Sequence, residues 1–144
     1  TLKHAISVGG LDERPCITEE LKVHAALERD DPNLPAHDPH RMYGSDSARI
    51  LEIAAADPAL AEPIHPDLPY TGAEIVWAAR EEMALDLDDA LSRRTRSLLL
   101  DASAAIEAAP RAASILASEL GRDAQWETDQ VRSFTKLANG YLLS

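Results

Sequence analysis

The sequence predicts an all-α fold, a compact bundle of about five to seven helices behind a long irregular N-terminal segment. Only 4% of the 144 residues are aromatic, so aliphatic and alanine side chains must build the core, and these suit helices better than sheets. Several segments place apolar residues three and four positions apart, as amphipathic helices do. A chain of this length can bury one core without disulfides or metals, so residues 1–144 are expected to form a single domain.

The N-terminal part is expected to be mostly irregular. Residues 1–8 carry apolar side chains at helical spacing and end at Gly9-Gly10, so we interpret them as the tail of a helix from the boundary with a preceding domain. Residues 9–40 leave room for one short element near residues 18–28, including a weak strand pattern. Four prolines interrupt regular structure in this part: Pro15, Pro32, Pro35 and Pro39.

Two helices are predicted next. The first is short, covers residues 39–43 and ends at Gly44, which can adopt the left-handed conformation. The second is capped by Ser45 or Asp46 and runs to Ala56, where an Asp-Pro pair ends it. Its apolar face is formed by Ile50, Ile53 and Ala54.

A capping box starts the following helix. The Thr71 hydroxyl can accept from the third helical amide, while the Glu74 carboxylate reaches back to the Thr71 amide. The helix is expected to extend to about residue 84. Its apolar stripe consists of Ile75, Val76, Ala79 and Met83.

The C-terminal half is predicted to be helical throughout. Residues 87–93 form a short helix with carboxylates at its start and arginines at its end, as the helix dipole favours. Asp101 caps an alanine-rich helix, Pro110 lies in the first turn of another, and Gly121 ends that one. The last helix, residues 124–142, carries a core-facing seam formed by Val131, Phe134, Ala138 and Tyr141.

The composition of the chain limits the classes of function that it can have. Asp and Glu number 25 against 14 Lys and Arg, a net charge of -11 that opposes binding to nucleic acid. Cys16 is the only cysteine, so an internal disulfide is impossible. No apolar run approaches the roughly 18–20 residues that span a bilayer, and the N-terminus lacks the apolar segment of a signal peptide. A cytoplasmic protein without a transmembrane segment is expected.

Arg93, Arg94 and Arg96 stand out in this acidic chain. Guanidinium groups bind phosphate well, so the cluster could hold a phosphorylated ligand. The favoured alternative is that the arginines contact a missing domain or pair with nearby carboxylates. Those carboxylates belong to Glu82, Asp86, Asp88 and Asp89.

Other reactive side chains lack a catalytic setting. His37 and His40 flank a carboxylate, but no further metal ligand converges on them, so surface histidines are the favoured interpretation. Cys16 follows acidic residues that oppose a reactive thiolate, which favours a structural cysteine. Three large aromatic residues are assigned to the core or to interdomain packing rather than to an external partner site: Tyr70, Trp77 and Trp126. No catalytic, cofactor-binding or metal-ligating residue is therefore predicted.

Several phrases of the sequence carry a family resemblance. They include Pro69 to Glu74, Arg93 to Arg96, Leu98 to Ala102, Ala109 to Arg111 and Glu119 to Gly121. In this order they closely resemble the C-terminal domain of FAD-dependent glycerol-3-phosphate dehydrogenases. The likeness reaches upstream to Pro15-Cys16 and so covers nearly the whole chain.

The resemblance implies that a longer parent enzyme oxidises sn-glycerol 3-phosphate to dihydroxyacetone phosphate with FAD and passes the electrons to quinone. The flavin-binding glycine motif of that family has no counterpart here. We therefore expect a C-terminal cap domain that binds no cofactor and is inactive alone. Its partner would be the missing oxidoreductase domain of the same chain, with the parent peripheral at the cytoplasmic face of the membrane. The alternative is a freestanding acidic helical module that binds another protein.

Overall fold

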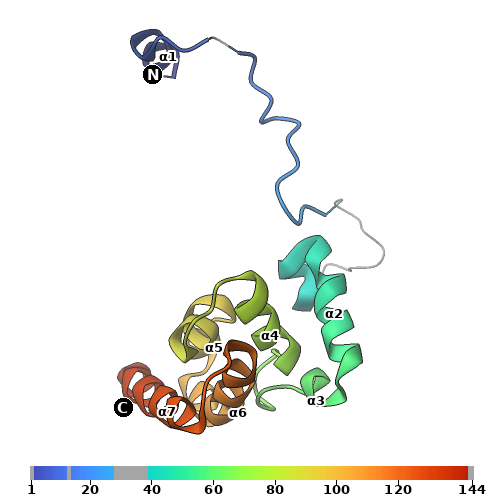
Figure 1. The fold of residues 1–144 in the computed structure, drawn as a ribbon, viewed down its shortest axis with the longest axis vertical. Coiled ribbons are helices and arrows are strands. Elements are labelled where there is room, and N and C mark those ends of the chain that lie inside the picture. Colours follow the sequence, from blue (N-terminus) through green and yellow to red (C-terminus); the bar gives the residue numbers. More distant parts are fainter. Residues whose placement is uncertain (1, 13, 28–38, 143–144) are drawn as a thin grey trace.

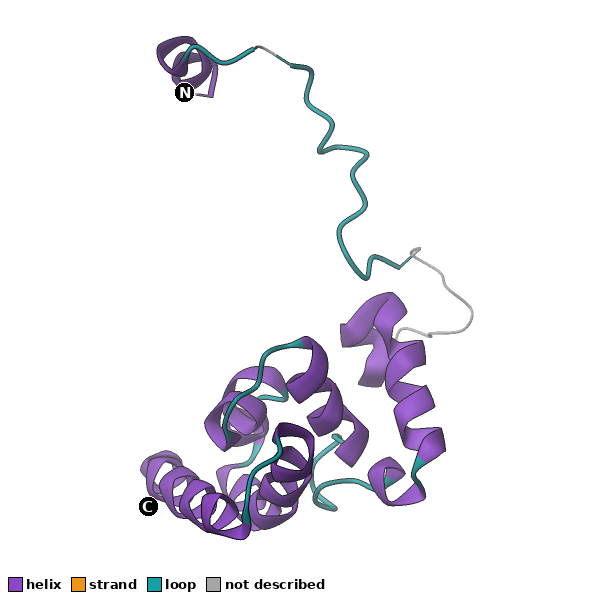
Figure 2. Cartoon of the chain, viewed as in Figure 1, coloured by secondary structure: helices purple, strands orange, loops and turns teal. Residues whose placement is uncertain are grey.

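The computed structural model describes residues 2–12, 14–27 and 39–142. These residues contain seven α-helices, three other helical segments and no strand, as Figure 2 shows. The only β pairing among them is an isolated bridge between Pro63 and Thr71. The all-α prediction is therefore confirmed.

Helix α1, Leu2–Gly9, lies apart from the helical body and is followed by an extended chain (Figure 1). This chain contacts the body at His24 and Ala25. The described part of residues 10–27 contains turns only, so the element expected near residues 18–28 is not seen there, and residues 28–38 lie outside the described part. A strand needs a neighbouring strand for its amides and carbonyls, and this segment has none among the described residues.

Gly44 fixes the point where the segment joins the body. The segment η1, Pro39–Asp46, is kinked at Gly44, whose φ of 58° and ψ of -134° suit glycine alone. A Cβ there would lie 1.8 Å from the carbonyl oxygen of Ala25. That oxygen accepts a hydrogen bond from the Ser45 amide at 3.2 Å, so the close approach of the two backbones requires glycine.

Helix α2 spans Ser47–Ala56 and begins without the predicted side-chain cap. Asp46 has a helical backbone conformation, and its carboxylate lies 2.6 Å from His24 Nε2 instead of capping the helix. The expectation that Ser45 or Asp46 caps α2 is therefore wrong. The predicted apolar face is confirmed, because Ile50 is buried and Ile53 and Ala54 are half-buried.

Asp57 ends α2 and starts the short helix α3, Pro58–Ala61. Its carboxylate accepts from the Ala59 amide at 2.9 Å. Arg111 then holds the following loop, because its guanidinium donates to the carbonyls of Pro63 and Ala59 at 2.9 and 2.7 Å. The loop therefore lies against the long helix α6, Ala102–Leu120, which carries Arg111.

Helix α4, Gly72–Glu81, lies at the centre of the body. The predicted capping box is present, and the Thr71 amide donates to Glu74 Oε2 at 2.7 Å. The first seven residues of α4 are all buried, because α2 packs on one side and α6 on the other. The helix ends before Met83, which has a φ of 56° and is 77% exposed, so its assignment to the apolar stripe is wrong.

Two short segments follow, and the sequence indicated only one. Residues 87–94 are helical as predicted, but Asp89–Arg94 form a π-helical turn, η2. Helix α5, Ser97–Leu100, comes directly after and was not predicted. A helix of four residues is too short to show an apolar period.

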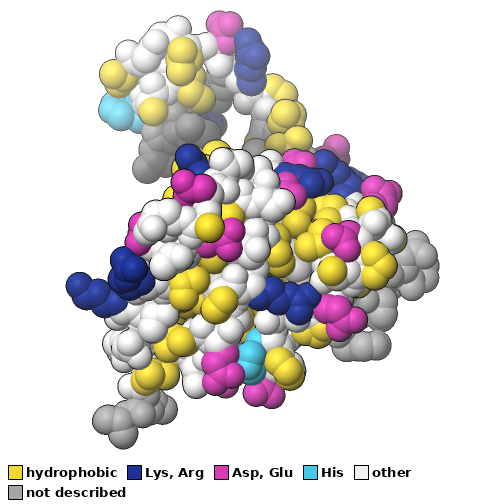
Figure 3. Space-filling model, turned by 60° about the horizontal axis from the view of Figure 1, so that its bottom comes forward, with side chains coloured by type: hydrophobic (Ala, Val, Ile, Leu, Met, Phe, Trp, Pro, Cys, Tyr) yellow, Lys and Arg dark blue, Asp and Glu magenta, His cyan; other side chains and the backbone are white. Residues whose placement is uncertain are grey.

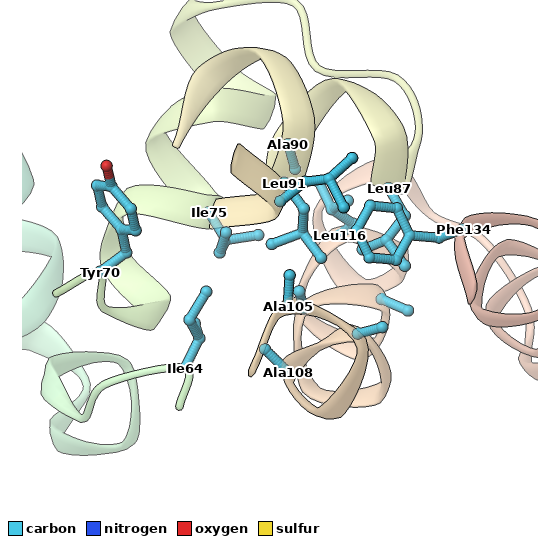
Figure 4. Close-up of a cluster of buried hydrophobic side chains, with 14 of the residues drawn as sticks. Ile64, Tyr70, Ile75, Leu87, Ala90, Leu91, Ala105, Ala108, Leu116 and Phe134 are labelled. Carbon is cyan, nitrogen blue, oxygen red and sulfur yellow. The ribbon is translucent and has the colours of Figure 1, made fainter. Parts of the chain in front are cut away.

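The long helices α6, Ala102–Leu120, and α7, Ala124–Ala138, pack against each other. Asp101 caps α6 through the Ala104 amide at 2.9 Å, and Gly121 ends it with a φ of 63°, both as predicted. A row of buried alanines lets neighbouring helices approach α6 closely. Figure 4 shows the main core cluster around it, which includes Leu87, Leu91, Ala105, Ala108, Leu116 and Phe134.

Two details of this region differ from the prediction. Pro110 lies inside α6, so the two helices expected there are one. The proline is exposed on the outer face of α6, where water can solvate the carbonyl that its missing amide leaves free. Tyr141 lies in the terminal turn η3, Asn139–Tyr141, and is 53% exposed, because α7 ends before the seam reaches it.

Replacing Pro110 with alanine is expected to raise the free energy of unfolding by about 1–2 kcal/mol. Alanine restores an amide that can donate within the helix and removes the clash of the ring with the preceding turn. The greater freedom of the unfolded chain offsets part of this gain. Urea denaturation measures the change, with Ser114→Ala, an exposed residue one turn further along α6, as the control. Destabilisation by Pro110→Ala would contradict the expectation.

Candidate functional site

We call the four residues Arg93–Arg96 the arginine turn; they comprise the last two residues of η2 and the two residues that join it to α5. Thr95 is fully buried, and its hydroxyl donates to the Ala90 carbonyl at 2.9 Å. The same hydroxyl shares a hydrogen bond of 2.8 Å with the buried Ser97. Thr95 thus anchors the turn from inside.

The three arginines have different surroundings. Arg93 lies 2.6 Å from the Asp88 carboxylate and 2.7 Å from that of Asp89. The charge of Asp88, followed by the bonds to Asp89, raises the pKa of the Arg93 guanidinium. Arg93 therefore has its ionic partners within the domain.

Arg94 and Arg96 have no such partners in the part of the chain that the structure describes. Arg94 is half-buried, and its Nε is buried without a hydrogen-bond acceptor among the described residues. Arg96 is exposed and has a φ of 58°, a left-handed conformation that costs an arginine of order 1 kcal/mol. No described carboxylate forms an ion pair with either side chain. Two cations are therefore presented on a turn that is held in a strained conformation.

A buried polar cluster lies beside the arginine turn and consists of Tyr43, Tyr70 and Glu74. Glu74 is only 2% exposed, accepts from the Thr71 amide and is hydrogen-bonded to the Tyr43 hydroxyl. Burial raises the pKa of Glu74, although these hydrogen bonds and the nearby His40 act in the opposite direction.

The two tyrosines connect this cluster to the arginine turn. Burial is the main cause that raises the pKa of both phenols, and the Glu74 carboxylate adds to it. The positive charge of Arg96 is close enough to lower the pKa of Tyr70 in opposition. In Figure 4 the Tyr70 ring lies at the edge of the core with its oxygen directed away from the apolar side chains. Tyr70 therefore joins the core to the polar cluster.

Glu74 was recognised from the sequence as a cap only. The signal for its burial was present, because apolar residues flank it on both sides and leave α4 no solvent-facing side at that level. Its contact with Tyr43 joins residues 31 positions apart in the sequence. The helical spacing of apolar residues cannot predict a contact between residues so far apart.

Glu74→Gln tests the burial of this carboxylate. Because its pKa is raised, the folded state keeps the proton after the unfolded chain has lost it, so the stability falls as the pH rises above the ordinary value of 4.5. We expect the wild type to lose stability relative to Glu74→Gln as the pH rises above 4.5 and through the raised pKa of Glu74. Urea denaturation across this range measures the difference, and Glu52→Gln, at an exposed position of α2, is the control. A constant difference would contradict the burial.

The other reactive residues form no site. His37 lies outside the described residues, and His40 is half-buried near Glu74. Cys16 is exposed, with its thiol 2.9 Å from the Thr18 hydroxyl, whose hydrogen bond lowers the thiol pKa. Within the described ranges, no group of three His, Cys, Asp or Glu side chains could hold a metal ion, and no helix is long and apolar enough to cross a membrane.

Another surface groove lies between α2, α4 and the end of α6. It has a volume of about 530 Å³, and both of its arginines pair with glutamates of the groove. Arg49 bonds Glu81 at 2.6 Å, and Arg80 bonds both oxygens of Glu119 at 2.6 and 2.9 Å. Arg49 also lies 4.8 Å from the centre of the buried Trp77 ring. This groove has little unsatisfied charge to offer a ligand.

Figure 3 shows one face of the molecule, on which acidic, basic and hydrophobic side chains are interspersed. No broad basic patch gathers on this face.

Comparison with known proteins identifies the family. Residues 8–127 match the family model described as the C-terminal domain of alpha-glycerophosphate oxidase. The proteins named glycerol-3-phosphate dehydrogenase 2 of Mycobacterium bovis and Mycobacterium tuberculosis are 37% identical over 79 residues, which are 55% of this chain and 14% of theirs. No solved structure matches the chain significantly. Since the family model covers most of the 144 residues, the chain belongs to the family of C-terminal domains of glycerol-3-phosphate oxidases and dehydrogenases.

Proposed function

We propose that the chain is the C-terminal domain of an FAD-dependent glycerol-3-phosphate dehydrogenase, and that its role there is structural. The observation that carries the proposal is the family match over residues 8–127, together with the small share of each relative that aligns. Because 79 residues are 14% of a relative, each mycobacterial protein is about 560 residues long. The parent would oxidise sn-glycerol 3-phosphate to dihydroxyacetone phosphate and transfer the electrons to quinone.

The described residues do not fit an FAD site. A dinucleotide-binding crevice is built from parallel strands, with a glycine-rich turn leading into a helix. The described part of the chain contains no strand, and the sequence has no Gly-x-Gly-x-x-Gly motif. We therefore place the flavin and the hydride transfer in the oxidoreductase part of the parent, which would lie at the cytoplasmic face of the membrane through its quinone.

What this domain contributes is a helical body that covers or buttresses the oxidoreductase part. The buried network of Thr95 and Ser97 fixes the arginine turn, and the Glu74 cluster fixes the start of α4 next to it. Both give the domain a rigid polar edge for contact with another domain.

The test is to express the whole reading frame that contains residues 1–144 beside residues 1–144 alone. The longer polypeptide should carry one flavin per chain and reduce a dye in the presence of glycerol 3-phosphate, whereas residues 1–144 should do neither. Stoichiometric flavin on residues 1–144 would overturn the proposal. A reading frame that opens directly before Thr1 would favour the freestanding module instead.

A further inference from the structure

We propose that one surface, formed by the arginine turn and the exposed leucines beside it, docks on an acidic segment of the oxidoreductase part. This inference rests on the proposed function. The docking surface consists of Arg94, Arg96, Leu99, Leu100, Tyr141 and Leu142.

The apolar half of the docking surface is formed by two segments, α5 and the residues that follow α7. Leu99 and Leu100 of α5 are 64% and 61% exposed, and Tyr141 and Leu142 are exposed beside them. All four line one groove of about 420 Å³. Large apolar side chains gathered in this way mark an interaction surface more often than scattered single ones do.

The basic half of the docking surface lies directly before α5, and Arg96 takes part in the first turn of that helix. The Arg96 carbonyl accepts from the amides of Leu99 and Leu100 at 3.0 and 3.2 Å, so the backbone that presents the arginine also presents the leucines. Arg94 adds a half-buried guanidinium that forms no ion pair with a described carboxylate, and a partner that supplies one would stabilise it. Carboxylates of a partner would therefore satisfy both Arg94 and Arg96.

The net charge of the domain limits which partner can bind the docking surface. The domain has a net charge of -11, so a second copy and an anionic membrane would both be repelled by the domain as a whole. In the mycobacterial relatives, 86% of the polypeptide lies outside the aligned 14%, which provides a tethered partner of ample size. An acidic segment with apolar neighbours in that part would satisfy both halves of the docking surface.

A photo-reactive amino acid at Leu99 of the longer polypeptide tests the contact, with Leu51 as the control. Leu51 is also exposed but lies on α2. Illumination should link Leu99 to an acidic segment of the oxidoreductase part within the same chain, and Leu51 should give little of this product. A link from Leu99 to a second copy, or no link at all, would overturn the proposal.

Charge variants complete the test. Arg94→Gln and Arg96→Gln together should lower the yield of the Leu99 cross-link by about tenfold or more, as expected for loss of buried charged partners. Arg132→Gln is the matched control, because Arg132 is exposed and bonds only Asp129 on its own helix. Unchanged yield in the double variant, with an unchanged urea midpoint, would contradict the docking role. Flavin content and dye reduction of the wild type test the proposed function separately, so the docking surface can fail while that function stands.

Discussion

Replacing Phe134 with alanine is expected to lower the free energy of unfolding by about 3–5 kcal/mol, much of the stability of a domain of this size. Phe134 is 2% exposed and is the only phenylalanine of the chain. Its ring inserts from α7 into the core cluster beside Leu87 and Leu116 (Figure 4). The alanine rows of α6 offer no large side chain that could fill the cavity.

Urea denaturation followed by circular dichroism measures this loss. Leu137→Ala on the same helix is the control, because Leu137 is 42% exposed and should cost much less. If the two variants were equally stable, the packing of α7 on α6 would be wrong. Loss of cooperativity in Phe134→Ala, with helical content retained, would agree with a weakened core.

Thr95→Val is expected to cost about 2–4 kcal/mol, although valine has nearly the same shape. The change leaves the Ser97 hydroxyl without its buried partner, which costs about 1–3 kcal/mol. It also removes one of the two hydrogen bonds to the Ala90 carbonyl, worth about 1 kcal/mol, while the Thr95 amide still donates to that carbonyl at 3.0 Å. It also releases the inner anchor of the arginine turn. In the longer polypeptide, the same variant should therefore weaken the docking of Arg94 and Arg96.

Thr128→Val is the matched control for this variant. Its hydroxyl donates to the Ala124 carbonyl at 3.0 Å in α7, but the residue is exposed and water can replace the bond. We expect a change within about 0.5 kcal/mol. Equal costs at the two positions would show that the buried network does not stabilise the turn.

Local signals predicted much of the fold. Thr71 with Glu74, Asp101 and Gly121 act within one helical turn, so the residue types alone locate these helix ends. The prediction that a helix starts at Pro110 was wrong for a physical reason. A proline on an exposed helix face can be retained when tertiary packing holds the helix on both sides of it. Met83 was wrongly assigned to the apolar stripe because the apolar spacing in the sequence continues one turn beyond the end of α4.

The candidate site was harder to predict. The sequence showed the three arginines but could not separate Arg93, which pairs with Asp88 and Asp89, from Arg94 and Arg96. That separation depends on the π-helical turn, which has no recognisable residue pattern. The contact of Glu74 with Tyr43 depends on how η1 packs against α2 and α4, in the cluster of Tyr43, Ile50, Ala73 and Trp77.

Hydrogen–deuterium exchange at residues 93–100 tests the central claim most directly. The exchange is measured in residues 1–144 alone and in the longer polypeptide encoded by the same reading frame. If this domain docks through the arginine turn and α5, the amides of these residues should exchange more slowly in the longer polypeptide, while those of exposed α2 residues stay the same. Equal exchange at residues 93–100 in the two proteins would contradict the account.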